Sequence, residues 1–103
     1  MSDLRNFSPA EVSGALARQE IVLVDVREAE EFQNVRIEGA VLRPLSQFDP
    51  ASLPPGTIVL QCGVGKRSAM AAEICAQAGV EVAGHLAGGI AAWAAAGLPV
   101  QRG

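Results

Sequence analysis

Short apolar runs alternate with amphipathic stretches along this chain of 103 residues. The runs at 21–26 and 57–61 are almost continuously apolar and rich in β-branched residues. Continuous rather than alternating apolarity is typical of strands that are covered on both faces, as in parallel sheets. Shorter apolar runs predict two further strands, at 40–42 and 80–86.

Helical patterns lie before and between these strands. The segment 8–11, Ser-Pro-Ala-Glu, predicts a helix N-terminus, because it offers a capping hydroxyl, a proline at the first helical position and a glutamate at the third. An acidic stretch at 28–32 predicts a short second helix, since carboxylates favour the positive end of the helix dipole.

Apolar residues at helical spacing predict two more helices, at 68–78 and 90–96. Strands that alternate with helices indicate an α/β fold in which helices cover both faces of a parallel sheet. The length of the chain suits a single domain spanning 1–103.

The composition narrows the classes of function. Half of the residues are hydrophobic, and the formal net charge is −3. Nucleic acids and anionic membrane surfaces usually require a basic face, so neither is expected as a partner. No apolar stretch of the sequence is long enough to span a membrane, and the first residues lack the apolar core of a signal peptide. We expect a cytoplasmic protein with reduced thiols.

Cys62 stands where the strand at 57–61 passes into the helix that follows. Ligands of open α/β sheets bind at the carboxyl ends of the strands, so this cysteine is well placed for chemistry. The loop that it begins contains two glycines, which can take the positive φ of a tight turn whose backbone N–H groups converge on an anion. We predict Cys62 as the catalytic nucleophile. The predicted substrate-binding loop comprises Gly63, Val64, Gly65, Lys66, Arg67 and Ser68.

Several features of this loop are expected to lower the pKa of Cys62. The thiolate is the nucleophile, whereas a free thiol is mostly protonated at neutral pH. Lys66 and Arg67 bring positive charge, and the N-terminus of the next helix adds its partial positive charge. Ser68 is predicted to be the N-cap of that helix. The alternative is an inert core cysteine, which fits poorly with a loop of glycines and cations.

The length of the loop separates two kinds of cysteine chemistry. Four residues lie between Cys62 and Arg67. Phosphotyrosine-type phosphatases have one residue more at this place, and commonly a histidine where this chain has Gln61. A shorter loop makes a smaller cradle, which suits a single sulfur atom better than a phosphate group. A phosphatase is therefore the less favoured alternative.

Four other residues allow a functional and a structural interpretation. Asp25 and Arg27 lie at the end of the strand at 21–26. They either help to orient the catalytic loop or meet an anion, or they pair with each other or cap the next helix; ion pairs at strand ends are usually structural. His85, the single histidine, could act as a base, but no Asn or Asp stands out in the sequence as its orienting partner. Cys75 lies about 10 Å along the helix, beyond the reach of a disulfide to Cys62, and is predicted to pack in the core.

Together these residues resemble the rhodanese family of sulfurtransferases. The pattern Cys-x-x-Gly-x-Arg-Ser at 62–68 is similar to the active-site loop of that family. Further segments resemble family patterns in the same order: 24–27, 37–40, 86–90, Trp93 and 97–100. The resemblance covers roughly four fifths of the chain, which is more specific than one motif. It implies a three-layer α/β/α sandwich with a five-stranded, mainly parallel sheet.

The resemblance also implies a thiosulfate sulfurtransferase. Cys62 would take the sulfane sulfur of thiosulfate or a related donor, carry it as a persulfide and pass it to cyanide or a thiol, with ping-pong kinetics. Asp25 and Arg27 would be supporting residues. No metal or organic cofactor is implied. The alternative is a persulfide carrier that delivers sulfur to a specific protein partner.

Overall fold

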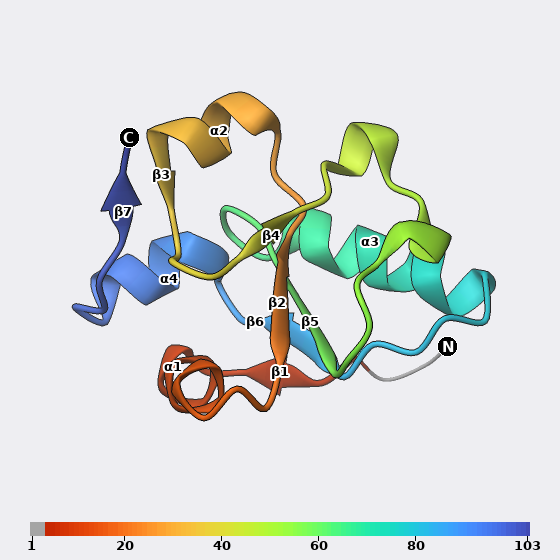
Figure 1. Cartoon of the computed structure of the whole chain (residues 1–103), viewed down its shortest axis with the longest axis horizontal. Coiled ribbons are helices and arrows are strands. Elements are labelled where there is room, and N and C mark those ends of the chain that lie inside the picture. Colours follow the sequence, from red (N-terminus) through yellow and green to blue (C-terminus); the bar gives the residue numbers. More distant parts are fainter. Residues whose placement is uncertain (1–3) are drawn as a thin grey trace.

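The computed structural model describes residues 4–103 and shows a five-stranded sheet with helices on both faces (Figure 1). In sheet order the strands are β1 Asn6–Phe7, β6 Gly84–Leu86, β5 Ile58–Gln61, β2 Val22–Asp25 and β4 Val41–Leu42. Every neighbouring pair in this sheet is parallel, so the carboxyl ends of its strands meet at one edge. The predicted α/β fold with a five-stranded, mainly parallel sheet is confirmed.

Four α-helices and two 3-10 turns connect these strands. They are α1 Pro9–Ala17, α2 Ala29–Asn34, α3 Lys66–Gln77 and α4 Gly89–Ala95, with η1 Leu45–Gln47 and η2 Pro50–Ser52. Within residues 4–103, no helix has both the length and the apolarity needed to cross a membrane.

Two further strands form a small antiparallel sheet beside the main one. They are β3 Val35–Arg36 and β7 Gln101–Arg102. Figure 1 shows this pair next to α4, where it ties the C-terminal segment to the chain that leaves α2. Neither strand was predicted, and nor was β1, because no apolar run of the sequence marks any of the three.

The core consists of two hydrophobic clusters, one on each face of the sheet. Successive side chains of a strand point to opposite faces. Val59 of β5 therefore packs with Trp93 of α4 in one cluster, whereas Leu60 packs with Ala71 and Ala72 of α3 in the other. All four residues of β5 are buried, as its continuous apolarity predicted. β5 is thus the central strand that carries Cys62 at its end.

α1 begins as predicted. The Ser8 hydroxyl accepts a hydrogen bond from the Glu11 backbone N–H at 3.1 Å, and the Glu11 carboxylate accepts one from the Ser8 N–H at 2.9 Å. These two bonds form a capping box. The helix buries Val12 and Ala15 against the sheet.

α3 begins two residues earlier than predicted, and the assignment of Ser68 as its N-cap is wrong. The N-cap is Gly65, whose φ of 107° lies in the left-handed region that glycine adopts readily. Ser68 is instead the third residue of the helix, where its side chain points into the protein. Met70 and Ile74 lie on the exposed side, with 57% and 37% of their surface accessible, while the small residues of the helix face the core.

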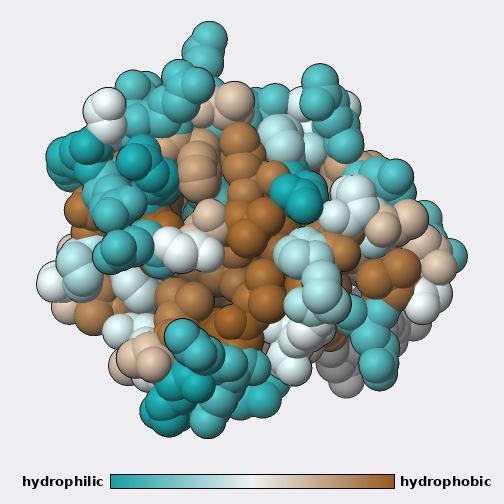
Figure 2. Space-filling model, viewed as in Figure 1, coloured by the Kyte–Doolittle hydropathy of each residue, from teal (hydrophilic) through white to brown (hydrophobic). Residues whose placement is uncertain are grey.

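β4 forms one edge of the sheet and is only two residues long. Figure 2 shows the surface of the molecule in the same view as Figure 1. Hydrophobic side chains form a continuous band across the middle of that surface, in the region where Figure 1 shows β4. Val41 and Leu42 are only partly buried. A short edge strand offers few free backbone groups for pairing with another chain.

Candidate active site

Cys62 follows the last residue of β5 and is fully buried. The first turn of α4 holds the backbone of the loop in place: the Ile90 N–H donates to the Cys62 carbonyl at 2.9 Å, and the Ala91 N–H donates to the Gly63 carbonyl at 3.1 Å. Gly89 makes this approach possible, because a Cβ there would clash with the Cys62 carbonyl oxygen. The start of the loop is therefore fixed by both β5 and α4.

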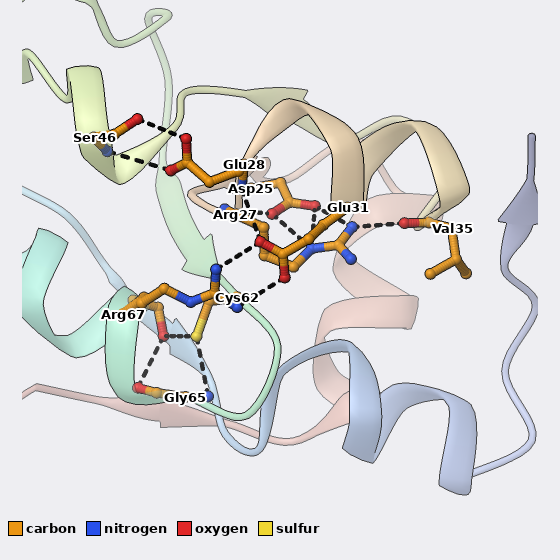
Figure 3. Close-up of polar contacts among 10 residues, drawn as sticks. Asp25, Arg27, Glu28, Glu31, Val35, Ser46, Cys62, Gly65 and Arg67 are labelled. Carbon is orange, nitrogen blue, oxygen red and sulfur yellow. Dashed lines mark hydrogen bonds and ion pairs between the residues drawn. The ribbon is translucent and has the colours of Figure 1, made fainter.

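The sulfur of Cys62 is surrounded by hydrogen-bond donors. The Gly65 N–H donates to Sγ at 3.0 Å (Figure 3). The Ser68 hydroxyl lies 3.6 Å from Sγ. Burial alone would raise the pKa of Cys62. Hydrogen bonds from the Ser68 hydroxyl and from the backbone N–H groups of Ser68, Gly65 and Val64 outweigh burial, so the pKa lies below its ordinary value. The surroundings therefore favour the thiolate.

The two cations of the loop do not both face the sulfur as free charges. Arg67 forms a bidentate ion pair with Glu31 of α2, with N···O distances of 2.7 and 3.0 Å (Figure 3). The Arg67 guanidinium also lies over the loop, since its Nη2 is 3.1 Å from the position that a Cβ of Gly63 would take. Lys66 is exposed. Glu31 balances the charge of Arg67. The pKa of Cys62 is therefore lowered mainly by hydrogen bonds to its sulfur.

Glu31 was missed by the sequence analysis. The hydrogen bonds from Arg67 lower its pKa to about 2, against a partial burial that acts in the other direction. Its carboxylate therefore stays ionised at any ordinary pH. The available signal was the acidic first turn of α2, but thirty-six residues separate Glu31 from Arg67.

Asp25 and Arg27 form a buried ion pair, which confirms that they pair with each other. The guanidinium donates to both carboxylate oxygens, at 3.1 and 2.8 Å, and the Arg27 backbone N–H adds a bond of 2.9 Å. Arg27 also donates to the Val35 carbonyl at 2.7 Å. The pair fixes the path of the chain from β2 into α2, and so it positions Glu31 (Figure 3).

A chain of polar groups runs from Cys62 to the sheet edge. The Ser68 hydroxyl lies 2.7 Å from His85 Nδ1, and His85 Nε2 lies 2.8 Å from the Asn6 side-chain oxygen. His85 thus has an orienting partner that the sequence did not reveal, because seventy-nine residues separate it from Asn6. Cys75 is fully buried in α3, and burial raises its pKa, as expected of a core thiol.

A cavity of about 350 Å³ opens beside the loop. Most of its lining is apolar, and polar groups come from two arginines and Glu31. The lining residues are Arg27, Glu31, Val35, Gly63, Val64, Ile90, Ala91, Ala94, Val100 and Arg102. The cavity adjoins the Arg67–Glu31 pair through Glu31 and the loop through Gly63 and Val64, whereas Cys62 itself does not line it.

Curated proteins from Synechocystis sp. and Mycobacterium tuberculosis are similar to this chain. The uncharacterized protein slr1261 of Synechocystis sp. is 44% identical over 85 residues, which cover 80% of this chain and 48% of that protein. The probable adenylyltransferase/sulfurtransferase MoeZ of Mycobacterium tuberculosis is 43% identical over 81 residues, which cover 74% of this chain and 21% of MoeZ. The chain thus spans about half of the first relative and about a fifth of the second.

A solved structure and a family model also match this chain. The crystal structure of a rhodanese-related protein from Thermoplasma volcanium matches with a TM-score of 0.83 and 27% identity, covering 94% of this chain and 97% of that one. The family model described as the rhodanese-like domain matches residues 8–96. Since that match includes the cysteine loop and the strands and helices that hold it, the chain belongs to the rhodanese-like domain family.

Proposed function

We propose that this protein is a sulfurtransferase that carries a sulfane sulfur as a persulfide on Cys62. The observation that carries the proposal is the sulfur of Cys62 inside a ring of hydrogen-bond donors, at the end of a central strand. Donors arranged in this way stabilise an anionic sulfur, whether thiolate or persulfide. The name of the MoeZ relative, a probable sulfurtransferase, supports the same chemistry.

The first half-reaction transfers sulfur to the enzyme. The Cys62 thiolate attacks the sulfane sulfur of thiosulfate, a new S–S bond forms, and the S–S bond of thiosulfate breaks. Sulfite leaves with the electron pair of the broken bond, and Cys62 becomes a persulfide anion. The exposed Lys66 attracts the dianionic donor, and Arg67 stabilises the departing sulfite once an anion competes with Glu31 for it.

The second half-reaction returns the enzyme to its thiolate. An acceptor thiolate attacks the terminal sulfur of the persulfide, so that the acceptor becomes a persulfide and Cys62 leaves as a thiolate. The cavity beside the loop is lined mainly by apolar side chains, including Val64 and Ile90. Apolar walls make favourable contacts with the hydrocarbon part of an organic thiol, whereas cyanide has no such part. We therefore propose an organic thiol as the acceptor.

A sulfur carrier for a protein partner is the second candidate. Val64, at the tip of the loop, is 65% exposed, and Met70 on the adjoining helix is 57% exposed. Large exposed apolar residues beside a reactive group are a feature of protein contacts. In this version the acceptor thiol belongs to a protein, and the chemistry on Cys62 is unchanged.

Intact mass spectrometry tests the persulfide directly. Wild type, Cys62→Ser and Cys75→Ala are treated with thiosulfate and compared with untreated samples. We expect a gain of one sulfur, about 32 Da, on wild type and Cys75→Ala and none on Cys62→Ser. The charged protein should then lose the sulfur to benzyl mercaptan faster than to 2-mercaptoethanol. No gain on wild type, or an equal gain on Cys62→Ser, would remove Cys62 as the sulfur-carrying nucleophile.

A further inference from the structure

A chain of polar groups links the nucleophile, at the end of the central strand β5, to the edge strand β1. Its members are Cys62, Ser68, His85 and Asn6, with successive separations of 3.6, 2.7 and 2.8 Å. Ser68 is fully buried and His85 is 8% exposed, so bulk water does not compete for the bonds of Ser68, whereas Asn6 at the far end is exposed. β1 and β6 hold the far end in register, because Asn6 and His85 are direct neighbours in the sheet. The two half-reactions of the proposed function assign no role to His85 or Asn6.

The hydroxyl of Ser68 has one proton and three acceptors within reach. They are His85 Nδ1, the Gly65 carbonyl at 3.2 Å and the sulfur of Cys62. If Nδ1 carries no proton, the hydroxyl donates to the ring and offers only a lone pair to the sulfur, which suits a thiol. If Nδ1 is protonated, the ring donates to Ser68, and the hydroxyl is free to donate to the sulfur, which suits a thiolate.

We propose that His85 is a positioning residue that turns the Ser68 hydroxyl toward Cys62 when the sulfur is anionic. In that state Nδ1–H donates to Ser68 Oγ, and Ser68 Oγ–H donates to the sulfur. His85 Nε2 then accepts from the side-chain amide of Asn6, which can present either its oxygen or its nitrogen. The thiol proton leaves to solvent, and the ring stays neutral because only its tautomer changes.

The surroundings of His85 agree with a neutral ring. Burial lowers its pKa, so the imidazole is uncharged at neutral pH. Among the charged side chains on the adjoining elements, Arg5, next to β1, pairs with Glu11, and Arg67 of α3 pairs with Glu31. Lys66 and Glu73, also on α3, are exposed. Arg5 meets His85 only through its carbonyl, which accepts from the His85 backbone N–H at 3.0 Å. Besides His85, the titratable group among these four polar residues is the thiol of Cys62.

The inference rests on Cys62 as the nucleophile of the proposed function, but its test measures ionisation and needs no sulfur donor. In a Cys75→Ala background, Cys62 is the single thiol, and its pKa follows from the pH dependence of alkylation by iodoacetamide. We expect His85→Leu to raise that pKa by about half a unit to one unit, the effect of one neutral hydrogen bond. Ser68→Ala should raise it by at least as much.

The double variant separates positioning from a structural role. If His85 acts through the hydroxyl, His85→Leu causes no further rise in the pKa of Cys62 once Ser68 is alanine. Equal shifts in both backgrounds would mean that losing His85 distorts the loop, and they would overturn the proposal. An unchanged pKa in the single variant would overturn it too.

Nitrogen NMR of the intact protein gives a readout that needs no variant at His85. The chain has one histidine, so its ring signals are unambiguous. We expect the Nδ1–H tautomer to dominate at pH values above the pKa of Cys62. A ring that keeps the Nε2–H tautomer on both sides of the Cys62 titration would refute the inference, even if a variant fails to fold. Failure of persulfide formation with thiosulfate would leave this result standing, so the two proposals fail independently.

Discussion

Replacing Glu31 by glutamine tests what the Arg67–Glu31 pair does at the loop that begins with Cys62. The carboxylate takes both ends of the guanidinium and balances its charge beside Cys62. An anionic donor must therefore compete with Glu31 for Arg67. Glutamine keeps the shape of the side chain and removes the charge. We expect Glu31→Gln to raise kcat/KM for thiosulfate, because Arg67 then meets the donor as an uncompensated cation.

The size of the effect follows from the pair itself. The pKa of Glu31 falls from 4.5 to about 2, mainly through the hydrogen bonds from Arg67. At about 1.4 kcal/mol per pKa unit, this fall corresponds to roughly 3 kcal/mol. The side chains of Arg67 and Glu31 are 35% and 39% exposed, however, and solvent screening limits such pairs to about 1 kcal/mol. That free energy corresponds to a rise in kcat/KM of about three- to five-fold.

Steady-state kinetics with thiosulfate as the varied donor supply the measurement. In a ping-pong reaction, kcat/KM for the donor reports the first half-reaction and does not depend on the acceptor. Glu30→Gln is the matched control: it makes the same change of charge on α2, and Glu30 forms no ion pair within residues 4–103. A value for Glu31→Gln at or below that of Glu30→Gln would mean that Glu31 orients Arg67 for the donor rather than competing with it.

The same pair predicts how stability depends on pH. The folded-state pKa of Glu31 lies below its ordinary value of 4.5, so its contribution is complete above that value and is lost as the pH falls toward 2. Wild type should exceed Glu31→Gln in free energy of unfolding by up to about 1 kcal/mol at pH 7. Urea denaturation should show this difference shrinking steadily below pH 4.5. A difference that stays constant down to pH 3 would contradict the assignment.

Other predictions concern the frame of the site and its cavity. Asp25→Asn should lower the free energy of unfolding by about 3–5 kcal/mol, measured by urea denaturation, because it leaves the buried Arg27 without a counter-charge. Gly89→Ala should slow alkylation of Cys62 or unfold the chain, since its Cβ would clash with the Cys62 carbonyl and its φ of 61° disfavours other residues. Val64→Ser should reduce kcat/KM for benzyl mercaptan about five-fold, through about 1 kcal/mol of lost apolar contact, and leave cyanide unaffected.

The sequence predicted the helices and the strands that stand out as apolar runs, β4 among them, and missed the strands that no apolar run marks. β2 and β5 were visible because long apolar runs are needed to fill both faces of the sheet. β1, β3 and β7 have two residues each and exist only because a partner strand lies beside them. Asn6 pairs with His85 across almost the whole chain, and no local pattern encodes that register.

The residues of the site also fall into those that the sequence could predict and those that it could not. The loop at 62–68 could be predicted because the cysteine, the glycines and the cations that form it are adjacent in the sequence. Glu31 and Asn6, which hold Arg67 and His85, come from other elements, and only the fold brings them there. The sequence therefore revealed which groups the loop contains, but not which of them are already paired.

This pairing changes the physical account of the nucleophile. Counted along the sequence, Lys66 and Arg67 would stabilise the thiolate by charge. In the fold, Glu31 balances Arg67, while the Gly65 N–H and the Ser68 hydroxyl meet the sulfur directly. Interactions of the sulfur with neutral donors in a buried loop are screened little by salt. These donors need no rearrangement when the negative charge moves from the thiolate to the persulfide. A site of this kind can stabilise thiolate and persulfide alike, while the charge of Arg67 becomes available only when an incoming anion displaces Glu31.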